Sequence, residues 1–269
     1  MKVLVFGSLG WIGSQFINVL KDHNIYYVET NIRADNERLV EDIIILHNPT
    51  HIVCCIGRKL TDNENYNENN YKNIRDNLYS PVILAILSTK YNIHLTYIGD
   101  GNIFNIFNNS NNINKTSEMI VKGFTDRLMR MYESNVLILR IKNPVVDFQD
   151  ENNFITKLIK RNEIYTVPNS ITVLCDMFPI IVDMIKNKTT GTFNLTNPDV
   201  ITDNEILELY KRIFDNSFTW TNKIINNCSN NQMNIINLLK LYPNIPTIRS
   251  SIINCLYNMR YKDDCFIEL

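Results

Sequence analysis

Three glycines near the start of the chain, Gly7-x-x-Gly10-x-x-Gly13, separate an apolar run from a helical pattern. Residues 2–6 are typical of a buried strand, and apolar residues from Trp11 onwards recur at the spacing of a helix face. Glycine permits a sharp turn, close approach of backbone N–H groups to a pyrophosphate, and tight helix–strand packing. The helix N-terminus adds partial positive charge. The pattern predicts a dinucleotide-binding turn, with an ordinary strand–turn–helix as the simpler alternative.

Composition and charge narrow the class of protein. The 269 residues are 45% hydrophobic and 20% charged, which fits one large or two small compact domains. A net charge of -1 gives no field that would attract nucleic acid or an anionic membrane. No apolar run is long enough for a membrane span, and we expect no signal peptide. The six cysteines lack metal-ligand spacing, which predicts reduced thiols, no metal site and an intracellular, cytoplasmic protein.

Strand and helix patterns alternate through residues 1–145, which predicts an α/β fold with a Rossmann-type, doubly wound parallel sheet. Polar segments at 61–73 and 102–114 are predicted as loops. The predicted strands are 2–6, 25–29, 51–55, 94–98 and 136–141, and helices are predicted after Gly10 and at 36–47, 74–90 (interrupted near Pro81) and 117–131.

The alternation loosens after Pro144, and residues 146–269 are predicted to form a small α+β C-terminal lobe that binds the substrate. Thr202 and Glu205 have the spacing of a capping box, which predicts a helix running to Phe214. The other elements predicted here are helices at 153–160, 176–186 and 250–259 and extended segments at 164–167 and 192–195.

The end of the second predicted strand normally distinguishes between dinucleotide cofactors. An acidic residue binds a ribose 2′-hydroxyl, whereas an arginine accommodates a 2′-phosphate. Glu29 and Arg33 offer both options, and we favour the phosphate form because Arg33 has no evident place in a core. A solvated loop arginine is the alternative. Gly57 and Arg58 follow the third strand at the edge where a cofactor would lie.

Several further stretches resemble the extended short-chain dehydrogenase/reductases, and within them the plant and viral nucleotide-rhamnose synthases related to dTDP-4-dehydrorhamnose reductase. They occur in the family's order over nearly the whole chain. The matching stretches are 7–13, Pro49-Thr-His-Ile52, Arg75-Asp-Asn-Leu78, Asn153-Phe-Ile-Thr-Lys157, Val167-Pro-Asn-Ser-Ile-Thr172, 191–198 and Asn204-Glu-Ile-Leu207.

The resemblance implies NADP(H) in the N-terminal lobe (1–145), a UDP- or dTDP-linked 4-keto-6-deoxyhexose in the C-terminal lobe (146–269), and a homodimer paired through helices 74–90 and 117–131. The implied cofactor-binding residues are Gly7, Gly10, Trp11, Ile12, Gly13, Arg33, Gly57, Arg58, Asn77 and Lys122. The implied substrate-binding residues are Asn153, Phe154, Lys157, Pro168, Asn169 and Asn230.

The chain departs from the family where protons are handled. The family reduces a sugar ketone with a Tyr-x-x-x-Lys pair and a hydroxyl at the end of the fourth strand. Lys122 matches the lysine, but Glu118 stands four residues before it and Asp100 replaces the hydroxyl. Asn102 replaces a cysteine proposed as an epimerisation acid/base, whereas Lys157 matches the family's second catalytic lysine.

These substitutions leave three hypotheses open. The chain is an active epimerase/reductase with a substituted acid, a non-catalytic NADP-binding regulatory or partner subunit, or an epimerase that does not turn its cofactor over. Three of the candidates also have a purely structural interpretation: Glu118 as an acid in a first helical turn, Asp100 as a turn residue, and Lys157 as a solvated lysine. The family's phosphate-binding Arg-Ser-Asn-Asn segment reads Cys228-Ser-Asn-Asn231 here.

Overall fold

The computed structural model describes residues 1–60, 66–103, 113–223 and 231–267. The chain divides into two compact units: Met1–Arg140 with Ile181–Phe193, and Ile141–Ile180 with Asn194–Leu269. Each unit is therefore assembled from two separate stretches of chain. Which ligand belongs to which unit stays a prediction.

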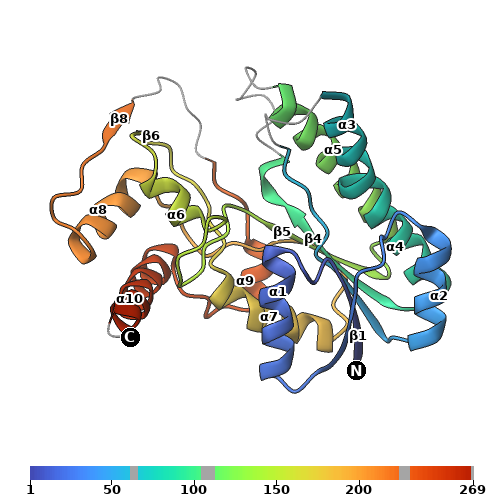
Figure 1. Cartoon of the computed structure of the whole chain (residues 1–269). Helices are drawn as coiled ribbons and strands as arrows, with labels where there is room; N and C mark the ends of the chain where they lie inside the picture. The colour runs from blue at the N-terminus through green and yellow to red at the C-terminus, as the bar shows by residue number, and fades with distance from the viewer. Residues whose placement is uncertain (61–65, 104–112, 224–230, 268–269) are drawn as a thin grey trace. The chain divides into compact units, whose positions relative to one another are not determined.

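The elements bear the labels of Figure 1. The strands are β1 (Lys2–Phe6), β2 (Tyr26–Thr30), β3 (His51–Cys54), β4 (His94–Asp100), β5 (Val136–Ile141), β6 (Glu163–Tyr165), β7 (Gly191–Asn194) and β8 (Thr221–Lys223). The helices are α1 (Trp11–Asp22), α2 (Glu37–His47), α3 (Tyr66–Ile74), α4 (Ser80–Lys90), α5 (Ile113–Met129), α6 (Phe154–Ile159), α7 (Leu174–Lys186), α8 (Asp203–Ile213), α9 (Ile236–Leu241) and α10 (Ile248–Ile267), with a π-helical turn η1 (Arg75–Tyr79) and a 3-10 turn η3 (Arg130–Tyr132).

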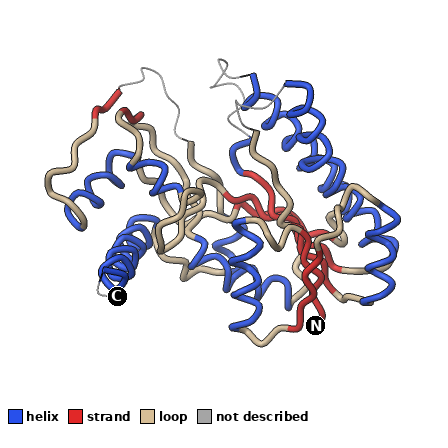
Figure 2. The backbone as a smooth tube through the Cα atoms, viewed as in Figure 1, coloured by secondary structure: helices blue, strands red, loops and turns tan. Residues whose placement is uncertain are grey.

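The first unit is built on a six-stranded sheet of order β2-β1-β3-β4-β5-β7 (Figures 1 and 2). The pairs β1–β2, β1–β3 and β3–β4 are parallel. Helix α1 lies on one side of the sheet and α2, α4 and α5 lie on the other (Figure 1). These features confirm the predicted Rossmann-type sheet. Because the strand order reverses direction at β1, the carboxyl ends of β1 and β3 border the switch point where such folds bind ligands.

Helix α3 corrects the prediction of a loop over residues 61–73, of which 61–65 lie outside the described residues. Its asparagine-rich sequence favours a loop, but Asn69 and Asn73 are fully buried. Asn73 donates to Ser117 Oγ at 3.3 Å, and Ser117 donates to Asn70 Oδ1 at 2.9 Å. Ser117 of α5 thus gives Asn70 and Asn73 hydrogen-bond partners, and this tertiary pairing outweighs the local preference.

The predicted interruption near Pro81 takes the form of the π-helical turn η1. Pro81 has no N–H, so it cannot donate to the carbonyl of Asn77, four residues earlier. That carbonyl accepts from Thr125 Oγ1 on α5 at 2.5 Å instead. Ser80 closes the wider turn through Oγ, which donates to Arg75 O at 2.9 Å. The turn therefore ties α4 to α5 and places Asn77 on the buried side.

Two buried histidines face each other at the amino ends of β3 and β4. His51 pairs with His94 in the parallel register, and the ring centroids are 5.4 Å apart. His94 Nε2 lies 2.7 Å from the carbonyl of Thr189, which can only accept, so Nε2 carries the proton. Burial lowers the pKa of His51 to about 4, with repulsion from His94, Lys188 and the N-terminal ammonium adding to it. Burial also lowers the pKa of His94.

Acidification is expected to destabilise the fold through this pair. The unfolded histidine titrates near pH 6.5, so its stabilising effect is complete above that pH and is lost as the pH falls towards about 4. The slope approaches about 1.4 kcal/mol per pH unit for each histidine. Urea unfolding of the wild type and of His51→Gln between pH 8 and 5 tests this, because the variant should lose less stability on acidification. Parallel curves would contradict it.

The second unit has a separate core around α6, α8 and α10. Its two-stranded sheet pairs β6 with β8 in parallel. The predicted capping box is confirmed: Thr202 Oγ1 accepts from the N–H of Glu205 at 3.1 Å, and Glu205 accepts from the N–H of Thr202 at 3.0 Å. The helix predicted over 250–259 is longer, since α10 spans Ile248–Ile267.

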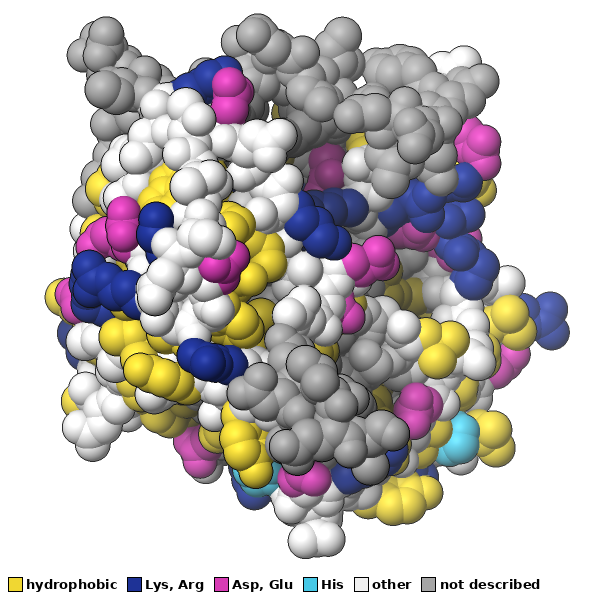
Figure 3. All heavy atoms as spheres, turned by 60° about the vertical axis from the view of Figure 1, so that its left-hand side comes forward, with side chains coloured by type: hydrophobic (Ala, Val, Ile, Leu, Met, Phe, Trp, Pro, Cys, Tyr) yellow, Lys and Arg dark blue, Asp and Glu magenta, His cyan; other side chains and the backbone are white. Residues whose placement is uncertain are grey.

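Basic and acidic side chains lie among neutral ones on the face shown in Figure 3, as expected for a net charge of -1. In the parts of the chain that the structure describes, no helix is both long enough and apolar enough to cross a bilayer.

Candidate functional site

The glycine turn after β1 has the backbone geometry that its spacing predicts. Gly7 has φ +77°, a conformation that side chains disfavour. A Cβ on Gly7 would lie 2.9 Å from the backbone of Cys55, and a Cβ on Gly13 would lie 2.0 Å from the carbonyl oxygen of Gly7. A Cβ on Gly10 would meet only Gly7 O, at 3.2 Å. All three positions therefore favour glycine, Gly7 and Gly13 most strongly.

Hydrogen-bond donors at the first turn of α1 lack side-chain partners. No side chain caps this turn, which includes Trp11, Ile12 and Gly13, and it contains no acidic residue. Ser8 Oγ and Trp11 Nε1 are buried and have no hydrogen-bond partner among the described residues. Unsatisfied donors at a helix N-terminus suit an anionic ligand. The residues present thus fit the pyrophosphate of a dinucleotide.

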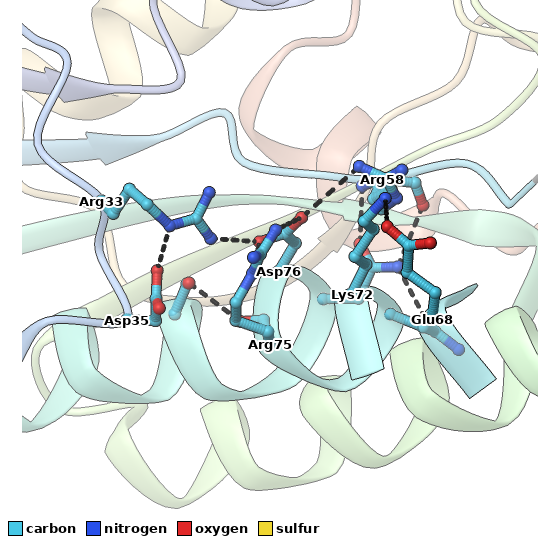
Figure 4. A network of polar contacts seen from close by, with 10 residues as sticks. Arg33, Asp35, Arg58, Glu68, Lys72, Arg75 and Asp76 are labelled. Carbon is cyan, nitrogen blue, oxygen red and sulfur yellow. Dashed lines mark hydrogen bonds and ion pairs between the residues drawn. The ribbon is translucent and has the colours of Figure 1, made fainter. Parts of the chain in front are cut away.

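Arg33 belongs to a cluster of charged residues beside the carboxyl end of β2 (Figure 4). Its Nε lies 2.8 Å from Asp35 Oδ1, and its Nη2 lies 2.9 Å from Asp76 Oδ1. Asp76 also accepts from Arg75 at 2.8 Å and lies 3.9 Å from Arg58. Burial raises the pKa of Asp76, but hydrogen bonds from Arg75 and Arg33 outweigh it and lower the pKa overall. Figure 4 also labels Lys72 and Glu68, which pair with each other, so the three arginines against two aspartates leave the cluster positive.

Asn77 fixes the segment that follows β3. Its side chain accepts from the N–H of Arg58 at 2.7 Å and donates to the carbonyl of Arg58 at 2.9 Å. It also donates to Asn73 Oδ1 at 2.8 Å. A Cβ on Gly57 would have no atom within 4 Å, so the space beside this residue is open. Asn77 thus shapes the edge of the predicted cofactor site through the backbone of Arg58.

Lys122 joins the candidate proton-handling residues in one cluster. Its ammonium lies 2.6 Å from Glu118 Oε1 and 3.1 Å from Asp100 Oδ2. Helix α5 places Glu118 and Lys122 one turn apart, and Asp100 ends β4. Asn102 donates to Asp100 Oδ1 from its backbone N–H at 2.8 Å and from Nδ2 at 3.0 Å. Four of the five residues predicted as catalytic therefore converge.

Charge in this cluster is largely shielded from water. The side chains of Glu118, Lys122 and Asp100 are 11%, 14% and 26% exposed. Burial lowers the pKa of Lys122, but the Asp100 and Glu118 carboxylates outweigh it and raise the pKa overall. The second oxygen of Glu118 accepts from the N–H of Leu60 at 3.0 Å. Both oxygens of Glu118 are thus occupied as acceptors.

Candidates at the start of α6 lie in the second unit. Asn153 is buried and caps α6 by accepting from the N–H of Ile155 at 3.2 Å. Its Nδ2 donates to the carbonyls of Val146 and Phe148. Lys157 Nζ donates to the carbonyl of Asn152 at 2.9 Å. Asn153 therefore stabilises the start of α6, in addition to its predicted role in binding the substrate.

Phe154 packs against the core of the second unit. Pro168 and Asn169 both bind Asn231, the first described residue after 224–230. The carbonyl of Pro168 accepts from the N–H of Asn231 at 3.0 Å, and Asn169 Oδ1 accepts from Asn231 Nδ2 at 3.0 Å. Asn230 lies outside the described residues.

Sequence reasoning missed three contributors. Asp76 holds Arg33, Leu60 binds Glu118 through its N–H, and Ser8 lies buried within the glycine turn. Asp76 follows Arg75 in a stretch already matched to the family, so it could have been identified. A backbone N–H such as that of Leu60 leaves no signal in a sequence.

No protein-family model matches the chain. It is 39% identical over 290 residues to protein L780 of Acanthamoeba polyphaga mimivirus, covering 97% of this chain and 100% of that protein. The crystal structure of the L780 UDP-rhamnose synthase from this virus matches with a TM-score of 0.85 and 37% identity, covering 96% of this chain and 99% of that one. A bifunctional dTDP-4-dehydrorhamnose 3,5-epimerase/dTDP-4-dehydrorhamnose reductase of Arabidopsis thaliana is 29% identical over 285 residues, covering 97% of this chain and 94% of that enzyme.

Proposed function

Since the chain belongs to the nucleotide-rhamnose synthases of the extended short-chain dehydrogenase/reductases, we propose that it is an NADP(H)-dependent epimerase/reductase of a UDP-linked 4-keto-6-deoxyhexose. The observation that carries the proposal is the cluster of Lys122 with Glu118 and Asp100. The cluster lies on α5 and at the end of β4, where the resemblance to the family implies that proton transfer takes place.

The glycine turn and the charged cluster support the choice of cofactor. Gly7, Gly10 and Gly13 would admit the pyrophosphate at the N-terminus of α1. Arg33 would bind a ribose 2′-phosphate, and the excess positive charge contributed by Arg58 and Arg75 favours that phosphate. The charged cluster around Arg33 therefore suits the 2′-phosphate of NADP(H) better than the 2′-hydroxyl of NAD(H).

NADPH, when bound, supplies the hydride that reduces the sugar ketone. The sugar oxygen then needs a proton, which we assign to the Lys122 ammonium. Glu118, 2.6 Å from that ammonium, would take up a proton from solvent after each transfer and return it to the neutral Lys122 amine, while Asp100 orients Lys122 and Asn102 fixes Asp100. Because the two carboxylates raise the pKa of Lys122, we expect slower proton transfer than with a tyrosine acid.

One observation favours a second candidate, an NADP(H)-binding subunit without turnover. Glu118 Oε1 accepts from Lys122 and Oε2 accepts from the N–H of Leu60. With both oxygens acting as acceptors, this arrangement presents no proton to a ligand. A protein that keeps the cofactor turn but holds Glu118 in this way would bind NADPH and leave the sugar unchanged.

Incubation with UDP-4-keto-6-deoxy-glucose and NADPH in heavy water, followed by NMR of the sugar, tests the proposal. We expect a reduced 6-deoxyhexose that carries deuterium at the epimerised carbons, and a loss of about 100-fold in rate in Glu118→Gln. Deuterium exchange without reduction would indicate an epimerase only. An unchanged sugar together with NADPH binding would overturn the proposal in favour of the binding subunit.

We further propose that the protein is a homodimer paired through α4 and α5. Ile120, Phe124 and Leu128 follow one another at intervals of four residues on α5 and are 42%, 56% and 37% exposed. Ile86 on the adjacent α4 is 43% exposed. An apolar stripe across two packed helices is typical of a covered surface.

Phe124→Asp is expected to produce monomers by burying a charge in the proposed dimer surface, with at least about a 100-fold weaker association. Sedimentation velocity measures this. Tyr261→Asp is the control, because Tyr261 is 72% exposed on α10, outside the stripe, and its replacement should leave the dimer intact. A wild type that sediments as a monomer would contradict the dimer proposal.

A further inference from the structure

One face of α10 is fastened to two other segments of the second unit. Ser251 Oγ donates to Asp176 Oδ2, near the start of α7, at 2.5 Å. Further along α10, Lys262 Nζ lies 2.9 Å from Asp147 Oδ2, to which Asn258 donates at 3.4 Å. The three α10 residues are seven and four positions apart, so they share a face of the helix.

Two cysteines lie between these anchor points. Cys255 is four residues after Ser251 on the same face of α10, and Cys175 directly precedes Asp176. The Ser251–Asp176 hydrogen bond brings the two cysteines side by side, their thiols interact, and both are free. Cys255 is 3% exposed, whereas Cys175 is exposed. An exposed cysteine therefore lies beside a buried one, and the contacts of Ser251 with Asp176 and of Lys262 with Asp147 hold α10 in place on both sides of Cys255.

The electrostatic surroundings distinguish the two thiols. The interaction with Cys255 lowers the pKa of Cys175, although partial desolvation of this exposed residue and the Asp147 carboxylate oppose this effect. The same interaction, with burial, raises the pKa of Cys255. Thiolates are the reactive form of cysteine, and sensor cysteines combine thiolate character, accessibility and a neighbouring resolving thiol. Cys175 has the features of the attacking thiol and Cys255 those of the resolving one.

We propose that Cys175 and Cys255 form a redox-modification site that hydrogen peroxide closes into a disulfide between α7 and α10. The Cys175 thiolate attacks one peroxide oxygen, the O–O bond breaks, and water leaves after protonation, which gives a sulfenic acid. The Cys255 sulfur then forms the S–S bond and displaces the sulfenic oxygen as a second water. Two thiols are oxidised by two electrons in total, and one peroxide is reduced.

Peptide mapping tests the proposal, because trypsin separates the two residues. Cys175 is the single cysteine of residues 162–186, and Cys255 is the single cysteine of residues 250–260. After exposure to one equivalent of hydrogen peroxide and alkylation, we expect these peptides joined, two hydrogens lighter than their sum, and separated again by dithiothreitol. The oxidised protein should melt several degrees higher, since the bond closes a long loop. Alkylated Cys175 after peroxide treatment would overturn the proposal.

Substitutions and an internal control sharpen the result. Cys175→Ser and Cys255→Ala should each abolish the joined peptide and the rise in melting temperature. Cys175 is exposed, so Cys175→Ser keeps the test open if Cys255→Ala misfolds. The peptide 39–58 carries Cys54 and Cys55, and burial raises the pKa of Cys54 to about 12 and that of Cys55 as well. This peptide should stay reduced, and equal oxidation of it would contradict a selective site.

Discussion

Replacing Gly13 with alanine is expected to abolish NADPH binding and to destabilise the protein. The new Cβ would lie 2.0 Å from the carbonyl oxygen of Gly7 and 3.0 Å from the Cα of Ser8. These neighbours are backbone atoms, so the turn itself must move, and with it the N–H groups that would bind the pyrophosphate. Overpacking of this kind costs about 1–3 kcal/mol or more. NADPH titration by fluorescence and thermal unfolding measure the two effects.

Ser14→Ala is the matched control for this substitution. Ser14 is the next residue of α1 and is exposed, and its hydroxyl donates to the carbonyl of Trp11 in the same helix. We expect it to change stability by less than about 0.5 kcal/mol and to leave NADPH affinity unaltered. A Gly13→Ala protein that binds NADPH as tightly as Ser14→Ala does would show that the turn does not form the cofactor site.

Lys122→Met is expected to destabilise the fold by about 3 kcal/mol and to eliminate turnover. Removal of the ammonium leaves the Glu118 and Asp100 carboxylates close together and largely shielded from water, without their shared cation. An unpaired buried charge is costly even where the intact pair contributes little. Urea unfolding measures the stability change, and NADPH oxidation in the presence of the keto-sugar measures turnover.

The double variant Lys122→Met/Glu118→Gln separates this repulsion from a loss of packing. If the cost arises from the uncompensated carboxylates, removing the charge of Glu118 should recover part of it, and the two substitutions will not be additive. Lys122→Arg retains the cation and should keep most of the stability. Additive effects in the double variant would contradict a charge cluster and leave Lys122 as a packing residue.

The Rossmann-type sheet could be predicted because its signals are local. Glycine spacing, apolar runs and the box formed by Thr202 and Glu205 each specify structure within a few residues of sequence. Helix α3 could not be predicted in the same way, since Asn70 and Asn73 find their hydrogen-bond partner in Ser117 of α5, which is distant in sequence. The π-helical turn was signalled by Pro81, but Thr125, which makes it possible, is distant in sequence.

In the candidate site, too, the residues could be predicted from the sequence but their contacts with one another could not. The sequence indicated that Lys122, Glu118 and Asp100 occupy positions the family uses, but not that one ammonium would contact both carboxylates. Arg33 was identified as a candidate for the 2′-phosphate, while its contact with Asp76 joins residues 43 positions apart. Pairings of this kind depend on tertiary contacts, which residue spacing alone does not specify.

Transfer of a labelled hydride from NADPH to the sugar tests whether the protein reduces a keto-sugar. The purified protein is mixed with UDP-4-keto-6-deoxy-glucose and NADPH carrying deuterium at C4 of the nicotinamide, and the sugar is followed by NMR. We expect deuterium at C4 of a reduced UDP-6-deoxyhexose in the wild type and none in Lys122→Met. NADPH that binds to the wild type without any deuterium reaching the sugar would contradict the claim that Lys122, Glu118 and Asp100 support reduction.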